Sequence, residues 1–136
     1  LSTVLDALKQ INNAGSHLEV THLVVTNAND NFDEYRAMLN WIVENLGHRI
    51  PFHISRYYPQ YKYSQPATEL ALLNDYVEAA REKLQFVYPG NVHADASTYC
   101  PECGELVISR SGYSTKTVAL SEKYCLNCQY ELPIII

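Results

Sequence analysis

The chain has 136 residues, 47% of them hydrophobic and 18% charged, with a formal net charge of −5. This length and hydrophobic fraction fit one ordinary domain, or a smaller domain with an appendage, and exclude a disordered chain. The acid excess is spread along the sequence, which argues against a surface that binds nucleic-acid phosphates. No signal peptide is recognisable and no apolar run approaches the ~20 residues of a membrane span, so we expect neither nucleic acid nor membrane as a partner.

The first predicted elements are a helix and a strand. Residues 1–14 place apolar side chains at helical spacing, and Gly15 follows as a stop signal. The segment 17–26 is short and rich in β-branched residues, which predicts a strand. Because the chain opens on Leu1 rather than Met, with the helix already under way, we expect a piece of a longer protein.

A second helix and a second strand follow. The polar turn at 27–30 can cap a helix over 31–46, and Gly47 is placed to end that helix. Residues 51–58 read as a strand, and residues 59–66 form a loop between two prolines. The side of this helix predicted to face the core comprises Phe32, Tyr35, Leu39, Ile42, Val43 and Leu46.

The third helix–strand pair completes the first part of the chain. Thr68 is a candidate cap for a helix over 68–84, and residues 86–88 predict a third strand. The turn at 89–91 then leads the chain away. The residues expected to face inward from this helix are Leu70, Leu73, Val77, Ala80 and Leu84.

Alternation of helices and strands with short connections predicts parallel strands joined by right-handed crossovers, which is the α/β class. A parallel sheet needs both faces covered, yet three strands in a barrel-like series have helices on one face. Either more protein closes the other face, or the helices split between the two faces of a small doubly wound sheet. We favour the first alternative.

The four cysteines form two pairs with identical C-x2-C spacing: Cys100, Cys103, Cys125 and Cys128. Two such pairs complete a tetrahedral shell of four sulfurs around one Zn²⁺, and a closed shell of this kind is structural rather than catalytic. Gly104 suits its turn because a residue without Cβ lets backbone N–H groups approach the sulfurs, whereas Gln129 fits the equivalent place less well.

Other states of the cysteines are less favoured. Two disulfides would be sparse for a secreted scaffold of this length, and iron ranks behind zinc. Redox catalysis is also disfavoured, since neither pair opens a helix after a strand. Thiolate ligands suit a reducing compartment, so we expect a cytoplasmic protein.

Polar residues interrupt the second strand. His53 and Ser55 alternate with two apolar residues, so the period of two places them on one face. Arg56 and Tyr57 follow at the carboxyl end of this strand, where α/β folds place ligands. The plainer alternative is a buried histidine satisfied by a backbone group. The same caution applies to Glu19, Thr21 and His22, whereas His17, His48 and His93 are expected at the surface.

Tyrosines gather after this strand, interleaved with two cations: Tyr57, Tyr58, Tyr61 and Tyr63, with Arg56 and Lys62. Such a set can stack on an adenine, or it can pack its rings over the mouth of a barrel with the phenols in water. Taken alone, these residues do not define an active site.

Several segments resemble a known family in order and spacing: residues 19–30, 52–62, 65–66, 87–92, 98–104 and 110–113. Together they are similar to the C-terminal part of radical SAM enzymes related to pyruvate formate-lyase activating enzyme, specifically the AmmeMemoRadiSam-system branch. The resemblance implies the last strands of a partial (β/α)6 TIM-like barrel over residues 1–96. A small zinc-ribbon-like module over residues 97–136 would follow.

The resemblance also implies cofactors and a role. Family members bind a 4Fe–4S cluster through C-x3-C-x2-C and cleave S-adenosylmethionine reductively, but this chain has no such motif. By resemblance, His53 would lie near the adenosyl group, with Arg56 and Tyr57 near the substrate mouth. No catalytic residue is assigned, and the chain alone is expected to be inactive.

The missing half would come from an N-terminal segment or another chain that completes the barrel, and the relatives imply a possible protein substrate. The sequence therefore predicts the C-terminal portion of a radical SAM oxidoreductase that contributes one barrel wall and a structural zinc site. The alternative is a non-enzymatic zinc-ribbon module for protein interactions.

Overall fold

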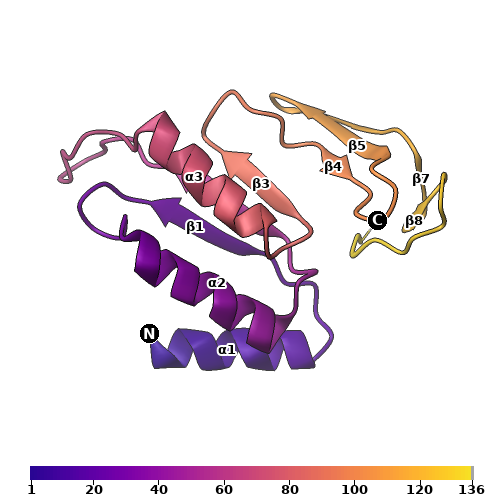
Figure 1. Ribbon diagram of the computed structural model, residues 1–136, viewed down its shortest axis with the longest axis horizontal. Coiled ribbons are helices and arrows are strands. Elements are labelled where there is room, and N and C mark those ends of the chain that lie inside the picture. The colour runs from indigo at the N-terminus through magenta and orange to yellow at the C-terminus, as the bar shows by residue number, and fades with distance from the viewer. Residues whose placement is uncertain (136) are drawn as a thin grey trace. The chain divides into compact units, whose positions relative to one another are not determined.

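The structure, a computed structural model, describes residues 1–135. The chain divides into two compact units between Val92 and His93, and each unit is described by itself. The first unit contains the helices and the parallel strands, and the second contains short antiparallel strands (Figure 1). The four cysteines also lie in the second unit.

Helices and strands alternate through the first unit: α1 (Ser2–Asn13), β1 (Val20–Val24), α2 (Phe32–Leu46), β2 (Phe52–Arg56), α3 (Leu70–Arg81) and β3 (Val87–Gly90). The three strands are parallel and adjacent in chain order, β1-β2-β3. Their register places Thr21 beside His53 and His53 beside Tyr88. The predicted mixed α/β fold with a three-stranded parallel sheet is confirmed.

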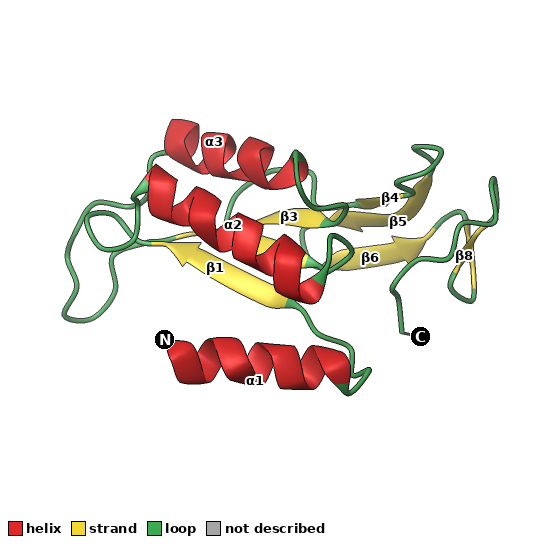
Figure 2. Ribbon diagram, turned by 60° about the horizontal axis from the view of Figure 1, so that its bottom comes forward, coloured by secondary structure: helices red, strands yellow, loops and turns green. Residues whose placement is uncertain are grey.

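Helices α2 and α3 cover the same face of this sheet (Figure 2). Phe52 and Ile54 of β2 point to this face, where both are fully buried among side chains of the two helices. These side chains are Tyr35, Leu39, Ile42 and Leu46 of α2 and Leu73, Tyr76, Val77 and Ala80 of α3. α1 packs beside α2. The doubly wound alternative is therefore wrong for α2 and α3.

The opposite face of the sheet is left uncovered by α2 and α3. Thr21 and Leu23 of β1 are exposed there, and His53 and Ser55 of β2 are half-buried. In β2 the residues on this face alternate with the buried Phe52 and Ile54, as the period of a strand requires. The first unit thus presents a parallel sheet with one packed wall and one open wall.

Two details of the helix ends differ from the predictions, and one agrees with them. Asn31, not the turn at 27–30, caps α2, because its Oδ1 accepts hydrogen bonds from the backbone N–H groups of Asp33 and Glu34. Gly47 ends α2 with φ +91°, as predicted. Thr68 does not cap α3; its fully buried hydroxyl donates to the Val24 carbonyl and accepts from the Tyr57 N–H.

The inward side of α3 is also rotated from the prediction. Leu70 is 52% exposed, whereas Tyr76, which was not predicted to face inward, is fully buried. α3 ends at Arg81, so Leu84 reaches the core from beyond the helix.

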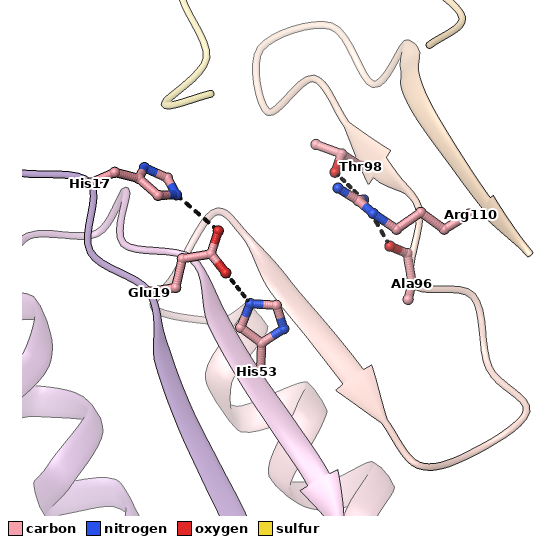
Figure 3. Close-up of polar contacts among 6 residues, drawn as sticks. All are labelled: His17, Glu19, His53, Ala96, Thr98 and Arg110. Atoms are coloured by element: carbon pink, nitrogen blue, oxygen red, sulfur yellow. Dashed lines mark hydrogen bonds and ion pairs between the residues drawn. The ribbon is translucent and has the colours of Figure 1, made fainter. Parts of the chain in front are cut away.

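The second unit contains five short strands: β4 (Thr98–Tyr99), β5 (Leu106–Ser111), β6 (Ser114–Thr117), β7 (Leu120–Ser121) and β8 (Tyr124–Cys125). β4, β5 and β6 form one antiparallel sheet, and β7 pairs with β8. Arg110 ties this unit together, because its Nη1 donates to the Ala96 carbonyl and to the Thr98 hydroxyl (Figure 3).

No helix in the described part of the chain is both long and apolar enough to span a membrane.

Candidate metal centre and open sheet face

The four predicted cysteines converge on one point in the second unit. Their sulfurs all lie within 4.8 Å of one another, and the Sγ–Sγ distance is 3.5 Å for Cys100–Cys128 and 3.7 Å for Cys103–Cys125. A tetrahedral ion with metal–sulfur bonds of ≈ 2.3 Å holds its sulfurs about 3.8 Å apart. All four cysteines are free, so the disulfide alternative is wrong.

Two backbone turns of matching shape present these sulfurs. The Gly104 N–H donates to the Cys100 carbonyl at 2.8 Å, and the Gln129 N–H donates to the Cys125 carbonyl at 2.9 Å. Gly104 has φ +75° and Gln129 has φ +63°, so both lie in the left-handed region. A Cβ at Gly104 would meet nothing within 4 Å, so the turn favours glycine for its φ and not for space, which corrects the predicted reason.

The surroundings of the sulfurs favour the thiolate form of Cys103. The Asn127 side chain, the Glu105 backbone N–H and neighbouring sulfurs lower the pKa of Cys103 to about 6, against the opposing effect of burial. Burial raises the pKa of Cys100. Four sulfurs this close cannot all carry charge without a cation among them, and a divalent ion resolves that repulsion.

The donor set therefore fits a metal such as zinc. A cluster of several irons would hold four cysteine sulfurs farther apart than one ion does. Because all four positions of a tetrahedron would be filled by protein, the site offers stability rather than an open coordination position for a substrate.

A second group of polar residues lies on the open face of the parallel sheet. Glu19 accepts hydrogen bonds through both carboxylate oxygens: His17 Nε2 lies 2.9 Å from Oε1, and His53 Nε2 lies 2.8 Å from Oε2 (Figure 3). An ionised carboxylate only accepts, so both imidazoles present an N–H at Nε2. In a neutral imidazole, the Nδ1 of His53 is then the hydrogen-bond acceptor. The ring of His53 lies 5.2 Å from that of Tyr88.

These contacts set the charge of Glu19. The hydrogen bond from His17 is the largest cause that lowers the pKa of Glu19, followed among the lowering causes by the contact with His53. Burial opposes them, but the net direction is downward from 4.5. Glu19 is thus a carboxylate that holds two imidazoles.

Sequence reasoning placed His53 on the polar face of its strand, but it did not find the group of three. His17 was expected at the surface, and Glu19 was given no partner. The missing information is the register of β1 against β2, which the sequence does not carry. His22 points to the opposite, packed face beside Tyr35 and Tyr76, where burial lowers its pKa.

Arg56 and Tyr57 lie at the carboxyl ends of the strands, as expected, beside a cleft of about 530 Å³. Tyr57 is buried, and its hydroxyl donates to the Tyr63 carbonyl at 2.8 Å. Arg56 donates from Nε to the Thr68 carbonyl at 2.8 Å. Of the tyrosine cluster, Tyr61 is 94% exposed and lies beneath the Lys62 ammonium.

The chain is 36% identical over 142 aligned positions to the uncharacterized protein MJ0808 of Methanocaldococcus jannaschii. The match covers 100% of this chain and 43% of the relative, so the chain spans less than half the length of the curated relative. No family model and no solved structure matches.

Proposed function

We propose that this chain is the C-terminal part of a radical SAM enzyme related to pyruvate formate-lyase activating enzyme. On this proposal the first unit is the last part of a partial (β/α)6 barrel. It contributes the wall that faces S-adenosylmethionine and the substrate, while the second unit is a structural zinc module. The protein would act in a reducing compartment, the cytoplasm.

The observation that carries the proposal is the open face of the parallel sheet. The strands follow one another in chain order and α2 and α3 lie on one side, as in a barrel wall seen from outside. A parallel sheet of this kind is normally covered on both faces. A second barrel segment would supply that cover, and the length of the relative leaves room for one.

His53 is the residue of this wall best suited to a nucleoside. It lies at the centre of the three strands, half-buried, and Glu19 fixes its ring through Nε2. The free Nδ1 can accept a hydrogen bond from a ribose hydroxyl or an adenine amino group. By family resemblance this group would be the adenosyl part of S-adenosylmethionine.

The 4Fe–4S cluster does not fit this chain. Its four cysteines surround a single point, and none is left for a cluster elsewhere. When bound, the cluster supplies the electron that cleaves S-adenosylmethionine. On the proposal, the remainder of the enzyme must hold it, so we assign no catalytic residue to this chain.

The test measures anaerobic formation of 5′-deoxyadenosine by the complete protein, with His53→Ala and His53→Gln compared with wild type. We expect wild type to release 5′-deoxyadenosine and His53→Ala to bind S-adenosylmethionine at least about tenfold more weakly, as loss of one or two buried hydrogen bonds would produce. His48→Gln, at the surface beyond α2, is the matched control. Equal rates and affinities for all variants would refute the role of His53.

The alternative is a non-enzymatic zinc module for protein interactions, favoured by the absence of a cluster motif from this chain. It predicts that the complete protein holds zinc, lacks iron and leaves S-adenosylmethionine intact. Metal analysis of the same preparation therefore separates the two functions.

A further inference from the structure

A guanidinium without a carboxylate partner lines the cleft at the carboxyl ends of the parallel strands. The cleft is formed by Leu23, Arg56, Tyr57, Tyr58, Gln60 and Asn91, all from the first unit. Among residues 1–135, no acidic side chain forms an ion pair with Arg56. A half-buried cation of this kind is costly unless an anion compensates it.

The hydrogen bonds of Arg56 leave most of its donors available. A guanidinium carries five N–H donors. Nε donates to the Thr68 carbonyl at 2.8 Å, and Nη1 donates to the Tyr58 hydroxyl at 3.0 Å. The other three N–H groups have no acceptor within the described part of the chain. These include both on Nη2, so the free edge can still receive an oxyanion.

Several contacts of Tyr58 and Asn91 hold Arg56 in place. The Tyr58 ring stacks on it, with the Arg56 Cζ 4.8 Å from the ring centroid. The Tyr58 hydroxyl donates to the Asn91 carbonyl at 3.2 Å, and Asn91 Nδ2 donates to the Arg56 carbonyl at 3.1 Å. Asn91 has φ +58°, in the left-handed region that asparagine tolerates better than most residues, and these two bonds help to hold it there.

We infer that this cleft is a binding site for a small carboxylate-bearing ligand with an apolar or planar body. One guanidinium matches the single charge of a carboxylate, whereas a phosphate dianion calls for more cations than the cleft lining supplies. Leu23, which is 42% exposed, and the two tyrosine rings provide apolar contact for the body of the ligand. The inference depends on the cleft alone and holds whether or not the chain belongs to a radical SAM enzyme.

The test is an NMR titration of the ¹⁵N-labelled, metal-loaded 136-residue chain with phenylacetate, phenylacetamide and inorganic phosphate. Phenylacetate should shift the Arg56 Nε–H signal and the amides of Tyr57, Tyr58 and Asn91 saturably. Phenylacetamide has the same shape without the charge, so it should bind at least about tenfold more weakly. Equal binding of the two, or tighter binding of phosphate, would overturn the assignment.

Variants separate the guanidinium from general charge effects. Arg56→Gln should weaken phenylacetate binding at least about tenfold, and Arg56→Lys should fall between it and wild type, since lysine keeps the charge but loses the fork. Lys62→Gln removes one positive charge from the neighbouring loop and should leave the affinity within about twofold. An unchanged affinity in Arg56→Gln would contradict the inference. If Arg56→Gln does not fold, the inference is tested by comparing the affinities of the wild type for phenylacetate and phenylacetamide.

Discussion

Glu19 and His53 stand 34 positions apart in the chain, yet their side chains meet at 2.8 Å because β1 and β2 are neighbours in the sheet. The carboxylate also bonds His17, so one anion orients two imidazoles on an open surface. An oriented histidine with a defined tautomer is better prepared to receive a ligand than a freely rotating one. Glu19 is therefore a positioning residue for His53.

The lowered pKa of Glu19 makes its contribution to stability depend on pH. A carboxyl group whose folded pKa lies below its unfolded value stabilises the fold above the unfolded value, here 4.5, and loses that effect as pH falls through the folded value. Glu19→Gln should lower the free energy of unfolding at pH 7 by less than about 1 kcal/mol, since the side chain is 47% exposed.

Urea unfolding of wild type and Glu19→Gln between pH 7 and pH 3 tests this. The difference between the two proteins should shrink as pH falls below 4.5. Glu44→Gln, an exposed glutamate on α2, is the control. A Glu19→Gln difference that stays constant or grows in acid would contradict the assigned contacts.

At the scale of elements, α2 and α3 contact each other through Tyr35 and Tyr76. The hydroxyl of one tyrosine is hydrogen-bonded, and the hydroxyl of the other is not. The Tyr35 hydroxyl donates to the Tyr76 carbonyl at 2.8 Å in the core. The Tyr76 hydroxyl is buried and has no hydrogen-bond partner among the described residues. The two rings stack with centroids 4.1 Å apart. One phenol therefore adds a bond, and the other carries an uncompensated desolvation cost.

Replacing each tyrosine by phenylalanine should separate these effects. Tyr35→Phe loses a buried hydrogen bond and should destabilise the fold by about 1 kcal/mol. Tyr76→Phe removes an unpaired hydroxyl and should leave the free energy of unfolding unchanged or raise it by up to about 1 kcal/mol. Each variant controls for the other in chemical denaturation. A larger loss in Tyr76→Phe than in Tyr35→Phe would contradict this description of the core.

The features that could be predicted from the sequence are those whose cause lies within a few neighbouring residues. Gly47 ends α2 through its own backbone, and the cysteine spacing sets each turn, so both were predictable. Thr68 was misassigned as a cap because its hydroxyl serves two strand ends, a tertiary demand that outweighs capping preference. The inward face of α3 was misplaced because Leu70 and Tyr76 satisfy helical spacing equally well.

The group of His17, Glu19 and His53 could not be predicted from the sequence, because its cause is not local either. It depends on the alignment of two strands, and a one-residue shift would send these side chains to the opposite face. The four-cysteine site could be predicted without knowing how any strands align, because the spacing within its two turns already indicates it.

On the scale of the whole molecule, the second unit should depend on its metal. Structural zinc sites bind with apparent free energies of about 10–16 kcal/mol, more than a short unit with few buried side chains gains from packing. A chelator should release the ion and unfold the strands of the second unit, while the helical circular dichroism signal of the first unit persists. Elemental analysis before and after treatment should show one zinc lost per chain.

Cys103→Ser should reproduce the chelator effect, because it removes one ligand of the shell. Ser109→Ala, on β5, is a control within the same unit. Retention of the second unit after complete metal loss would show that the cysteines do not form its structural centre.

If the chain is part of a barrel, further protein covers the open face of the parallel sheet. Diethylpyrocarbonate labelling of the histidines, read by mass spectrometry, tests this directly. His53 should react in the 136-residue chain and become protected in the complete protein, while the exposed His93 serves as a reference. Equal reactivity of His53 in both would contradict the barrel proposal.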